Sequence, residues 1–329
     1  MDIAHNIGWV ILGLAGLYYG AEWLVRGSAG LALSAGLSSL VVGLTVVAFG
    51  TSLPELIVSM QANLQGGKDS GDFALGNVIG SNICNIGLVL AVAAIMTSIH
   101  VQPQIIKREL VLLIFASVLF VVMLLADGKI GHIEGLILAT GIVAYTYFSI
   151  SIAKRNPHDP LAAAAEEELE DIGEEENGSN SQLAKNLLLT VAGLIFLGIG
   201  SDRLVVGGQF LAEEFGVSTA LITLTLIAFG TSLPELATTV IACLKNEAEL
   251  AAGNAIGSCI FNLLCVAGIT SLVKPIERNL IAIEDMMVMT GFAVALFLLM
   301  KRKPILERKT GFVLLSAYMV YMAFLFIRG

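Results

Sequence analysis

Two glutamates lie in the middle of long apolar segments of this 329-residue chain. Glu55 is part of the sequence AFGTSLPEL, which covers Ala48–Leu56 and recurs without change at Ala228–Leu236, where it carries Glu235. An ionisable group at bilayer depth costs about 2.5 kcal/mol or more on insertion scales, so it normally faces a partner or a water-filled pathway. Two carboxylates in identical surroundings therefore predict a shared site.

Hydroxyl residues and a proline accompany each glutamate. A threonine and a serine stand about one helical turn before the acid; these residues are Thr51, Ser52, Thr231 and Ser232. Pro54 and Pro234 have no N–H, so neither can bond the carbonyl four residues earlier in a helix. The pattern predicts two broken helices, one interrupted near Gly50 and the other near Gly230. The carbonyl oxygens freed at each break are expected to line a site or to be buried in protein.

A second pair of polar segments follows the two nonapeptides. The glycine-rich sequences GNVIGSNICN (76–85) and GNAIGSCIFN (253–262) lead into continuous apolar sequence. Each carries a serine and an asparagine four residues apart, on one helical face; these residues are Ser81, Asn85, Ser258 and Asn262. Such residues also pack helices together in membranes, and that role stays open for any single one of them. Packing does not explain Glu55 and Glu235, because the nearest basic residues lie at the ends of their segments.

These side chains together form an all-oxygen ligand set. Carboxylates, hydroxyls, side-chain amides and carbonyls suit hard cations such as Ca²⁺ and Na⁺ rather than softer metals. Histidine is missing from the set, because all four histidines lie at the start of the chain or in connecting segments. The usual imidazole proton relay and the usual zinc ligand are therefore excluded.

The composition is that of a polytopic membrane protein. Hydrophobic residues make up 56% of the chain and charged residues 14%, and the mean hydropathy is +0.85. A spanning helix needs about 20 residues. Apolar runs of that order lie near 7–25, 38–64, 73–97, 109–126, 133–153, 184–205, 217–243, 250–272, 280–300 and 311–327. The ninth is the least regular, because Glu284 and Asp285 lie in its first turns and indicate a water boundary.

The second half of the chain repeats the first. The nonapeptides are 180 positions apart and the glycine-rich segments 177 positions apart, which is the signature of an internal duplication. We expect a five-helix repeat at 1–153, an acidic cytoplasmic linker at 154–183 and a second five-helix repeat at 184–329. An odd number of spans inverts the second repeat relative to the first. The predicted fold is an all-α integral membrane protein with ten transmembrane helices, of which helices two and seven are broken, and with its site at the repeat interface.

Basic residues indicate the orientation in the cell membrane. If the central linker is cytoplasmic, twelve Lys and Arg residues lie inside and six outside, as the positive-inside rule favours. We therefore expect both termini outside. Glu22 and Arg26 stand four residues apart near the end of the first span and are expected to form an interfacial ion pair.

The two GTSLPEL copies, each followed by a GN-x-IGS-x-I-x-N segment, resemble the α-repeats of the cation/calcium exchanger superfamily, most closely those of prokaryotic Na⁺/Ca²⁺ exchangers. The resemblance covers the whole chain. It implies a secondary antiporter that exchanges Na⁺ for Ca²⁺ by alternating access, in which the first and sixth spans move across a core of spans two, three, seven and eight. Two ionised glutamates balance one Ca²⁺, whereas three Na⁺ would leave one positive charge, so electrogenic exchange is permitted.

The same resemblance implies which residues bind the ions. Glu55 and Glu235 would bind Ca²⁺ and share in the Na⁺ sites. The other implied ligands are Thr51, Thr231, Ser52, Ser232, the main-chain oxygens of Ala48 and Ala228, and Ser81, Ser258, Asn85 and Asn262. Potassium-dependent relatives carry an aspartate where this chain has Asn262, so its absence argues against potassium co-transport.

Three other functions compete with this interpretation. An H⁺/Ca²⁺ antiporter would use the same two glutamates, because a desolvated carboxylate can bind a proton. An intramembrane hydrolase lacks a histidine or lysine near its serines, and a passive channel would show current without counter-ion dependence. We expect no enzymatic activity, no cofactor and no nucleic-acid partner, and we expect a monomer in the lipid bilayer with Ca²⁺ and Na⁺ as substrates.

Overall fold

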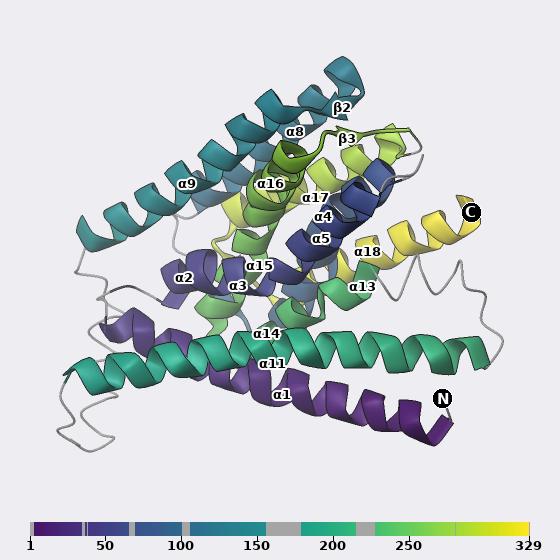
Figure 1. The fold of residues 1–329 in the computed structure, drawn as a ribbon. Helices are drawn as coiled ribbons and strands as arrows, with labels where there is room; N and C mark the ends of the chain where they lie inside the picture. Colours follow the sequence, from purple (N-terminus) through teal and green to yellow (C-terminus); the bar gives the residue numbers. More distant parts are fainter. Residues whose placement is uncertain are drawn as a thin grey trace.

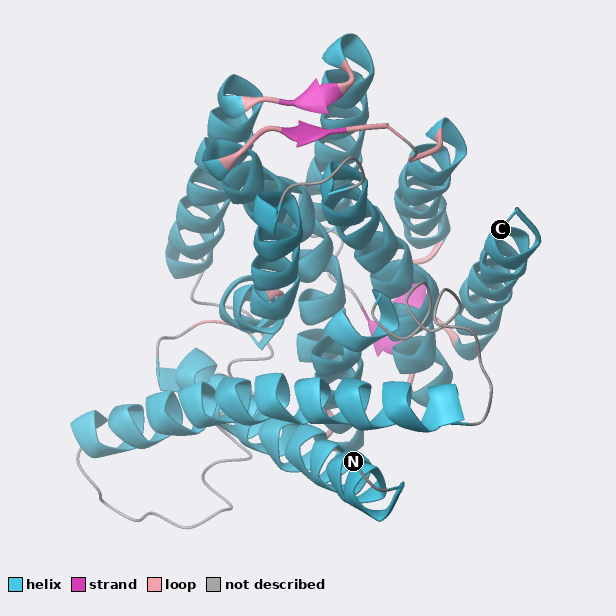
Figure 2. Cartoon of the chain, turned by 45° about the vertical axis from the view of Figure 1, so that its right-hand side comes forward, coloured by secondary structure: helices cyan, strands magenta, loops and turns pink. Residues whose placement is uncertain are grey.

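The structure is a computed structural model that describes residues 3–34, 37, 39–65, 70–100, 106–155, 179–214, 228–279 and 281–328. Helices dominate the described residues, and four two-residue strands accompany them (Figures 1 and 2). Most of the predicted linker 154–183 lies outside the described residues; the last helix before it, α9, ends at Arg155 and the first helix after it, α11, begins at Ser179.

The described elements of the first half run in the order α1 (Ile3–Ser34), α2 (Ser39–Val42), η1 (Gly43–Val47), α3 (Ala48–Thr51), α4 (Leu53–Gln65), α5 (Ser70–Cys84), η2 (Asn85–Val89), α6 (Leu90–Met96), β1 (Ile99–His100), η3 (Ile106–Leu110), α8 (Val111–Asp127), β2 (Lys129–Ile130) and α9 (His132–Arg155). Those of the second half are α11 (Ser179–Glu214), α13 (Ala228–Thr231), α14 (Leu233–Leu244), α15 (Ala248–Phe261), η5 (Asn262–Val266), α16 (Ala267–Val273), β3 (Ile276–Glu277), α17 (Ile283–Arg302), β4 (Ile305–Leu306) and α18 (Arg308–Arg328). The elements named η are single π-helical turns; η1, η2 and η5 continue into α-helix on both sides, and η3 continues into α8.

Nine of the ten predicted spans appear among the described residues as helices long and apolar enough to cross a membrane. The predicted span 217–243 falls partly on residues 215–227, outside the described residues, and its described part holds the shorter apolar helix α14. The ninth span is a 20-residue helix that begins at Ile283. Asp285 in its first turn is only 4% exposed and forms an ion pair with Arg328.

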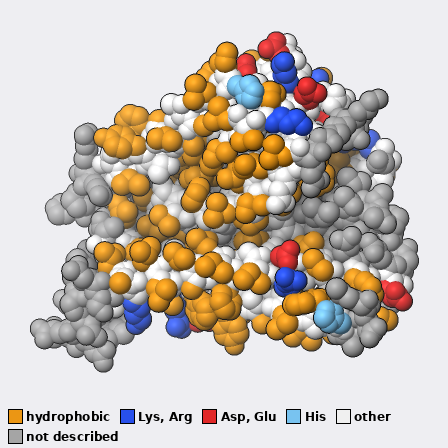
Figure 3. Space-filling model, in the orientation of Figure 1, with side chains coloured by type: hydrophobic (Ala, Val, Ile, Leu, Met, Phe, Trp, Pro, Cys, Tyr) orange, Lys and Arg blue, Asp and Glu red, His pale blue; other side chains and the backbone are white. Residues whose placement is uncertain are grey.

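The outer surface is apolar, as lipid contact requires. Leu188 is 70% exposed, Val143 69% and Val320 70%, although each would be buried in the core of a soluble protein. Figure 3 shows hydrophobic side chains over much of one face, with few charged groups among them. The chain is a multi-pass membrane protein.

The two longest helices, α1 and α11, lie side by side along one edge of the molecule (Figures 1 and 2). Glycine permits this close contact. A Cβ on Gly20 would lie 2.7 Å from the backbone nitrogen of Leu197, and one on Gly200 would lie 2.7 Å from the backbone nitrogen of Leu17. The small residues thus let the helix backbones meet, as they do at many helix contacts in membranes.

The centre of the molecule is formed by α5 and α15, whose spans are the most buried of the candidate spans. Both carry the glycine-rich segments. α5 packs against α4, and α15 packs against α14 and also across the molecule against α2, η1 and α3. The core helix of the second half therefore contacts the nonapeptide helix of the first half directly.

Two short antiparallel strand pairs connect the halves. β1 pairs with β4, so that Ile99 lies opposite Leu306, and β2 pairs with β3, so that Ile130 lies opposite Ile276. Each pair joins one connecting segment from each half, and the two pairs lie well apart (Figure 2).

Candidate functional site

The nonapeptide helices are interrupted at one residue each. Ser52 separates α3 from α4 with φ −84° and ψ 4°, and Ser232 separates α13 from α14 with φ −90° and ψ 6°. The predicted break is therefore real but narrower than expected. The Ser52 N–H still donates to the carbonyl of Ala48 at 3.1 Å, and the Ser232 N–H donates to the carbonyl of Phe229 at 3.1 Å. Backbone hydrogen bonding therefore continues across each interruption, and neither helix is divided into two separate halves.

The two glutamates lie at the interface between the halves, and both are fully buried. Ser232 Oγ donates to Glu55 Oε1 at 3.4 Å, and Ser52 Oγ donates to Glu235 Oε1 at 3.3 Å. Each serine therefore serves the glutamate of the opposite half. These reciprocal contacts join residues 177 and 183 positions apart, and they are the arrangement expected of a shared site.

Each glutamate has one carboxylate oxygen without a partner. Oε2 of Glu55 and Oε2 of Glu235 are both buried and make no hydrogen bond in the structure. Among the described residues no ion pair involves either glutamate. A buried carboxylate without a counter-charge is strongly unfavourable, so this pair has the character of a cation site.

The glycine-rich helices carry further buried polar groups, and Ser258 lies at the same interface. Ser258 Oγ lies 3.4 Å from Thr51 Oγ1. Ser81 Oγ and both side-chain amide atoms of Asn85 and of Asn262 are buried without hydrogen-bond partners. Because buried polar atoms are almost always paired, these unpaired atoms are unusual.

Asn85 and Asn262 are also the first residues of the π-helical turns η2 and η5. π-Helical turns are rare and occur frequently at functional sites. They stand 177 positions apart, which is the offset of the two glycine-rich segments. The same backbone irregularity therefore recurs at the same predicted ligand in both halves.

The predicted main-chain ligands lie beside the hydroxyl residues. Ala48 precedes Thr51 in α3, and its carbonyl accepts the Ser52 N–H at 3.1 Å. Ala228 is the first residue of α13, the corresponding helix of the second half.

Two residues of the site were not predicted from the sequence. Asn77 Oδ1 accepts from Thr231 Oγ1 at 3.2 Å, and Asn254 Oδ1 accepts from Thr51 Oγ1 at 3.0 Å. Both belong to the Gly-Asn pair that opens each glycine-rich segment. Their recurrence was therefore visible in the sequence, but their contact with a threonine of the other half was not.

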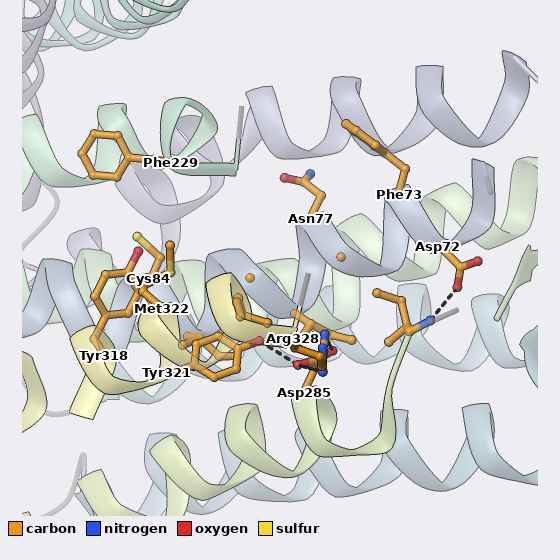
Figure 4. Close-up of a pocket in the computed structure, with 16 residues that line it drawn as sticks. Asp72, Phe73, Asn77, Cys84, Phe229, Asp285, Tyr318, Tyr321, Met322 and Arg328 are labelled. Carbon is orange, nitrogen blue, oxygen red and sulfur yellow. Dashed lines mark hydrogen bonds and ion pairs between the residues drawn. The ribbon is translucent and has the colours of Figure 1, made fainter. Parts of the chain in front are cut away.

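A cavity of about 280 Å³ reaches this network from one side. It lies between α5, α17 and α18, and Asn77 is among the residues that line it (Figure 4). Asp285 accepts from Arg328 Nη2 at 2.9 Å and from the Tyr321 hydroxyl at 3.1 Å. This cluster joins the first turn of α17 to the end of α18 in the wall of the cavity.

The ligand set contains no soft donor. The described residues hold no group of three or more His, Cys, Asp or Glu side chains that could bind a metal ion. The candidate site instead combines two carboxylates with hydroxyl, amide and carbonyl oxygens, which is the chemistry of a hard cation. Together with the multi-pass fold, this defines a membrane transporter of cations rather than an enzyme.

Comparison with known proteins identifies the family. The Sodium/calcium exchanger protein family matches residues 5–151 and 185–327. The chain belongs to this family, whose members are membrane antiporters of Ca²⁺ and a second cation; the ions are substrates, and no cofactor takes part.

Individual relatives match over nearly the full length. The chain is 38% identical to the putative antiporter CaxA of Alkalimonas amylolytica, over 97% of this chain and 98% of that protein. It is 29% identical to the sodium/calcium exchanger MaX1 of Methanosarcina acetivorans, over 98% and 99%. A solved structure of the sodium-calcium exchanger NCX_Mj, soaked with Na⁺ and Sr²⁺, superposes with a TM-score of 0.83 at 29% identity and covers 98% of this chain and 99% of that chain. A more distant relative is the Ca²⁺/H⁺ antiporter ChaA of Bacillus subtilis, at 27% identity over 91% and 86%.

Proposed function

We propose that the protein exchanges Na⁺ for Ca²⁺ and that Glu55 and Glu235 bind Ca²⁺ together. The observation that carries this proposal is the pair of buried carboxylate oxygens that have no protein partner. One Ca²⁺ bound between the glutamates would neutralise both charges and take up both orphaned oxygens. Na⁺-dependent exchange is also named for the relatives MaX1 and NCX_Mj.

The number of oxygens supports sodium as the counter-ion. Ca²⁺ takes about 6–8 oxygen ligands, and the site offers more candidates than that. The candidate neutral ligands are Thr51, Thr231, Ser52, Ser232, Ser81, Ser258, Asn85, Asn262 and the carbonyls of Ala48 and Ala228. The surplus suggests additional ion positions, which Na⁺ would fill as Ca²⁺ leaves.

We further propose electrogenic exchange, since one Ca²⁺ balances a site of charge −2, whereas three Na⁺ would leave one positive charge to move with each cycle. Alternating access would follow from movement of α1 and α11 across the core. These two helices pack along each other, and because Gly20 and Gly200 have no side chains, their backbones come close together. Both termini would lie outside the cell, with the residues between α9 and α11 in the cytoplasm.

The principal alternative is exchange of H⁺ for Ca²⁺ by the same glutamates, as the name of the relative ChaA describes for that protein. Hydroxyl and amide oxygens favour sodium over this alternative, because a bound proton needs only the carboxylate, whereas Na⁺ needs several oxygen ligands at once. The buried and unpaired amides of Asn85 and Asn262 have no role in a proton antiporter.

The test is uptake of ⁴⁵Ca²⁺ into proteoliposomes. Vesicles loaded with Na⁺ and diluted into Na⁺-free buffer should accumulate Ca²⁺, whereas vesicles loaded with choline should not. Clamping the membrane potential with valinomycin and K⁺ should alter the rate if the exchange is electrogenic. Equal uptake in both vesicle types, or uptake that follows only an imposed pH gradient, would remove sodium coupling and favour the proton antiporter.

A further inference from the structure

Asn77 and Asn254 hold equivalent places in the two halves, 177 positions apart. Asn254 is fully buried and Asn77 is 6% exposed. Neither carries charge. In each, the side-chain oxygen accepts a hydrogen bond from a residue of the candidate site and the side-chain nitrogen donates one to another. We propose that these asparagines are positioning residues that turn the hydroxyl of the opposite half's threonine so that its lone pairs face the ion; this inference rests on the cation site proposed above.

The orientation of each amide is determined by a backbone carbonyl. Asn77 Nδ2 donates to the carbonyl of Glu55 at 3.0 Å and to Ser59 Oγ at 2.9 Å. Asn254 Nδ2 donates to the carbonyl of Glu235 at 3.4 Å. Turning either amide over would bring its oxygen against a carbonyl oxygen, and both are acceptors only. Oδ1 of each asparagine is therefore directed at the threonine.

The direction of the threonine hydrogen bond follows from the amide. A carboxamide oxygen cannot donate, so Thr51 is the donor in its 3.0 Å contact with Asn254 Oδ1, and Thr231 is the donor in its 3.2 Å contact with Asn77 Oδ1. The carboxylates of Glu235 and Glu55 are second acceptors for these two hydroxyls, and the asparagine oxygens compete with them for the hydrogen. A hydroxyl has one hydrogen and two lone pairs. With the hydrogen held by the asparagine, the lone pairs are left for other partners, and a cation binds only lone pairs.

A main-chain oxygen competes for the same hydrogen. The Thr51 hydroxyl lies 3.5 Å from the carbonyl oxygen of Ala48, which also accepts the Ser52 N–H. That distance is at the limit for a hydroxyl hydrogen bond, whereas 3.0 Å is within the ordinary range. Asn254 therefore keeps the Thr51 hydrogen away from a carbonyl that is itself a candidate ligand.

The pairing crosses between the halves. The asparagine of α15 orients the threonine of α3, and the asparagine of α5 orients the threonine of α13. Each glycine-rich helix thus sets the ligand geometry of the opposite nonapeptide helix and is also hydrogen-bonded to the glutamate backbone of its own half. Ion affinity should therefore depend on contact between the halves at these two points.

A double-mutant cycle on the full-length protein tests the inference. Ca²⁺ binding to the purified protein is measured by calorimetry for wild type, Thr51→Val, Asn254→Leu and the double variant, and the melting temperature is measured without ions. If Asn254 acts through Thr51, each single variant should weaken Ca²⁺ binding about tenfold, the scale of one hydrogen bond, and the double variant should be no weaker than Thr51→Val. Thr51→Val combined with Asn77→Leu should instead lose about a hundredfold, because Asn77 acts through the other threonine.

Additive losses in the Thr51–Asn254 cycle, or an Asn254→Leu variant that melts earlier yet binds Ca²⁺ as wild type does, would overturn the inference and leave Asn254 a packing residue. If Asn254→Leu does not fold, the cycle of Thr231→Val and Asn77→Leu gives the same decision from the other half. Wild-type protein that binds no Ca²⁺ would instead refute the proposed function itself, so the two failures are distinguishable.

Discussion

Lys245 Nζ lies 3.2 Å from Glu22 Oε1, the same carboxylate oxygen that receives Arg26 Nη2 at 2.9 Å. The first contact ties α1 to the residue that directly follows α14, the helix that carries Glu235. The positions related by the repeat are Asp202 and Gln65, which cannot form an ion pair. Among the described residues Asp202 forms an ion pair only with its neighbour Arg203, so in this part of the chain the ion pair between Lys245 and Glu22 has no counterpart at the related position.

We predict that Lys245→Gln shifts the balance between the two access states. If α1 slides across the core during transport, this ion pair stabilises the state seen here and must break in the other. The Lys245 side chain is 30% exposed and that of Glu22 19%, and pairs near a surface contribute up to about 1 kcal/mol, or about a fivefold change in the balance of states. The measurement is the labelling rate of single cysteines placed along α1, together with the Ca²⁺ transport rate.

The matched control is Lys303→Gln. Lys303 also pairs with a glutamate at 3.3 Å, but its partner Glu307 is four residues away and both side chains are well exposed. This variant should leave labelling and transport unchanged. If Lys245→Gln behaves like Lys303→Gln, the contact with Glu22 has no part in the conformational cycle.

Replacing either buried glutamate with glutamine should abolish Ca²⁺ transport while the protein still folds. Glutamine keeps an oxygen that can accept from Ser232 or Ser52, so the hydrogen bonds across the halves survive and only the charge is lost. A Ca²⁺ site that loses one of its two charges should bind at least about a hundredfold more weakly. Uptake of ⁴⁵Ca²⁺ and gel-filtration profiles check this, with the exposed Glu307→Gln as control; transport near the wild-type rate in Glu55→Gln or Glu235→Gln would remove that residue from the site.

Much of the candidate site could be predicted from the sequence because the same polar residues recur at equivalent positions of the two halves. Glu55 and Glu235 stand out because burying a carboxylate in a membrane span costs free energy. The predicted ion pair of Glu22 with Arg26 is confirmed, because residues four apart on a helix lie side by side. The partners that the sequence does not indicate all come from far along the chain. Lys245 joins Glu22 across 223 positions, and no helical period or motif specifies such a contact.

The interruption of the nonapeptide helix shows a second limit of the sequence prediction: its position was predicted, but its extent was not. Pro54 removes one hydrogen bond, and from that the sequence predicts two separate half-helices around the nonapeptide. In the structure the chain departs from helical geometry only at Ser52, because the Leu56 N–H still reaches the Ser52 carbonyl at 3.2 Å and the turn continues. Local chemistry locates the interruption, and its extent could not be predicted from the sequence because it depends on how the helix packs, here with α15 against α3.

Two glycines two positions apart on α11 should respond in opposite ways to alanine. A Cβ on Gly200 would lie 2.7 Å from the backbone of Leu17 in α1, whereas a Cβ on Gly198 would have no neighbour within 4 Å. Gly200→Ala should push α1 and α11 apart, lower the melting temperature and slow exchange. Gly198→Ala should be neutral or stabilising by about 0.5–1 kcal/mol, because alanine loses less backbone entropy in a helix.

Thermal unfolding in detergent and the exchange rate in proteoliposomes distinguish these outcomes. Equal melting temperatures for the two variants would mean that the helices separate without cost, and that the close contact of α1 with α11 does not stabilise the protein.

The last prediction concerns Asn262, which is fully buried and has no partner for either side-chain amide atom. Asn262→Asp exchanges the neutral amide for a carboxylate of nearly the same shape at the first residue of η5. A third acid in the site raises its charge to −3, and the added charge needs a cation because a buried carboxylate is unfavourable without one. We expect stronger Ca²⁺ binding, by about tenfold, or a dependence of transport on K⁺ that the wild type lacks.

Calorimetry with Ca²⁺ and ⁴⁵Ca²⁺ uptake with and without K⁺ measure both, and Asn262→Leu, which removes the oxygen without adding charge, is the matched control and should weaken cation binding. Unchanged affinity and ion selectivity in both variants would make Asn262 a packing residue and would exclude η5 from the ion sites.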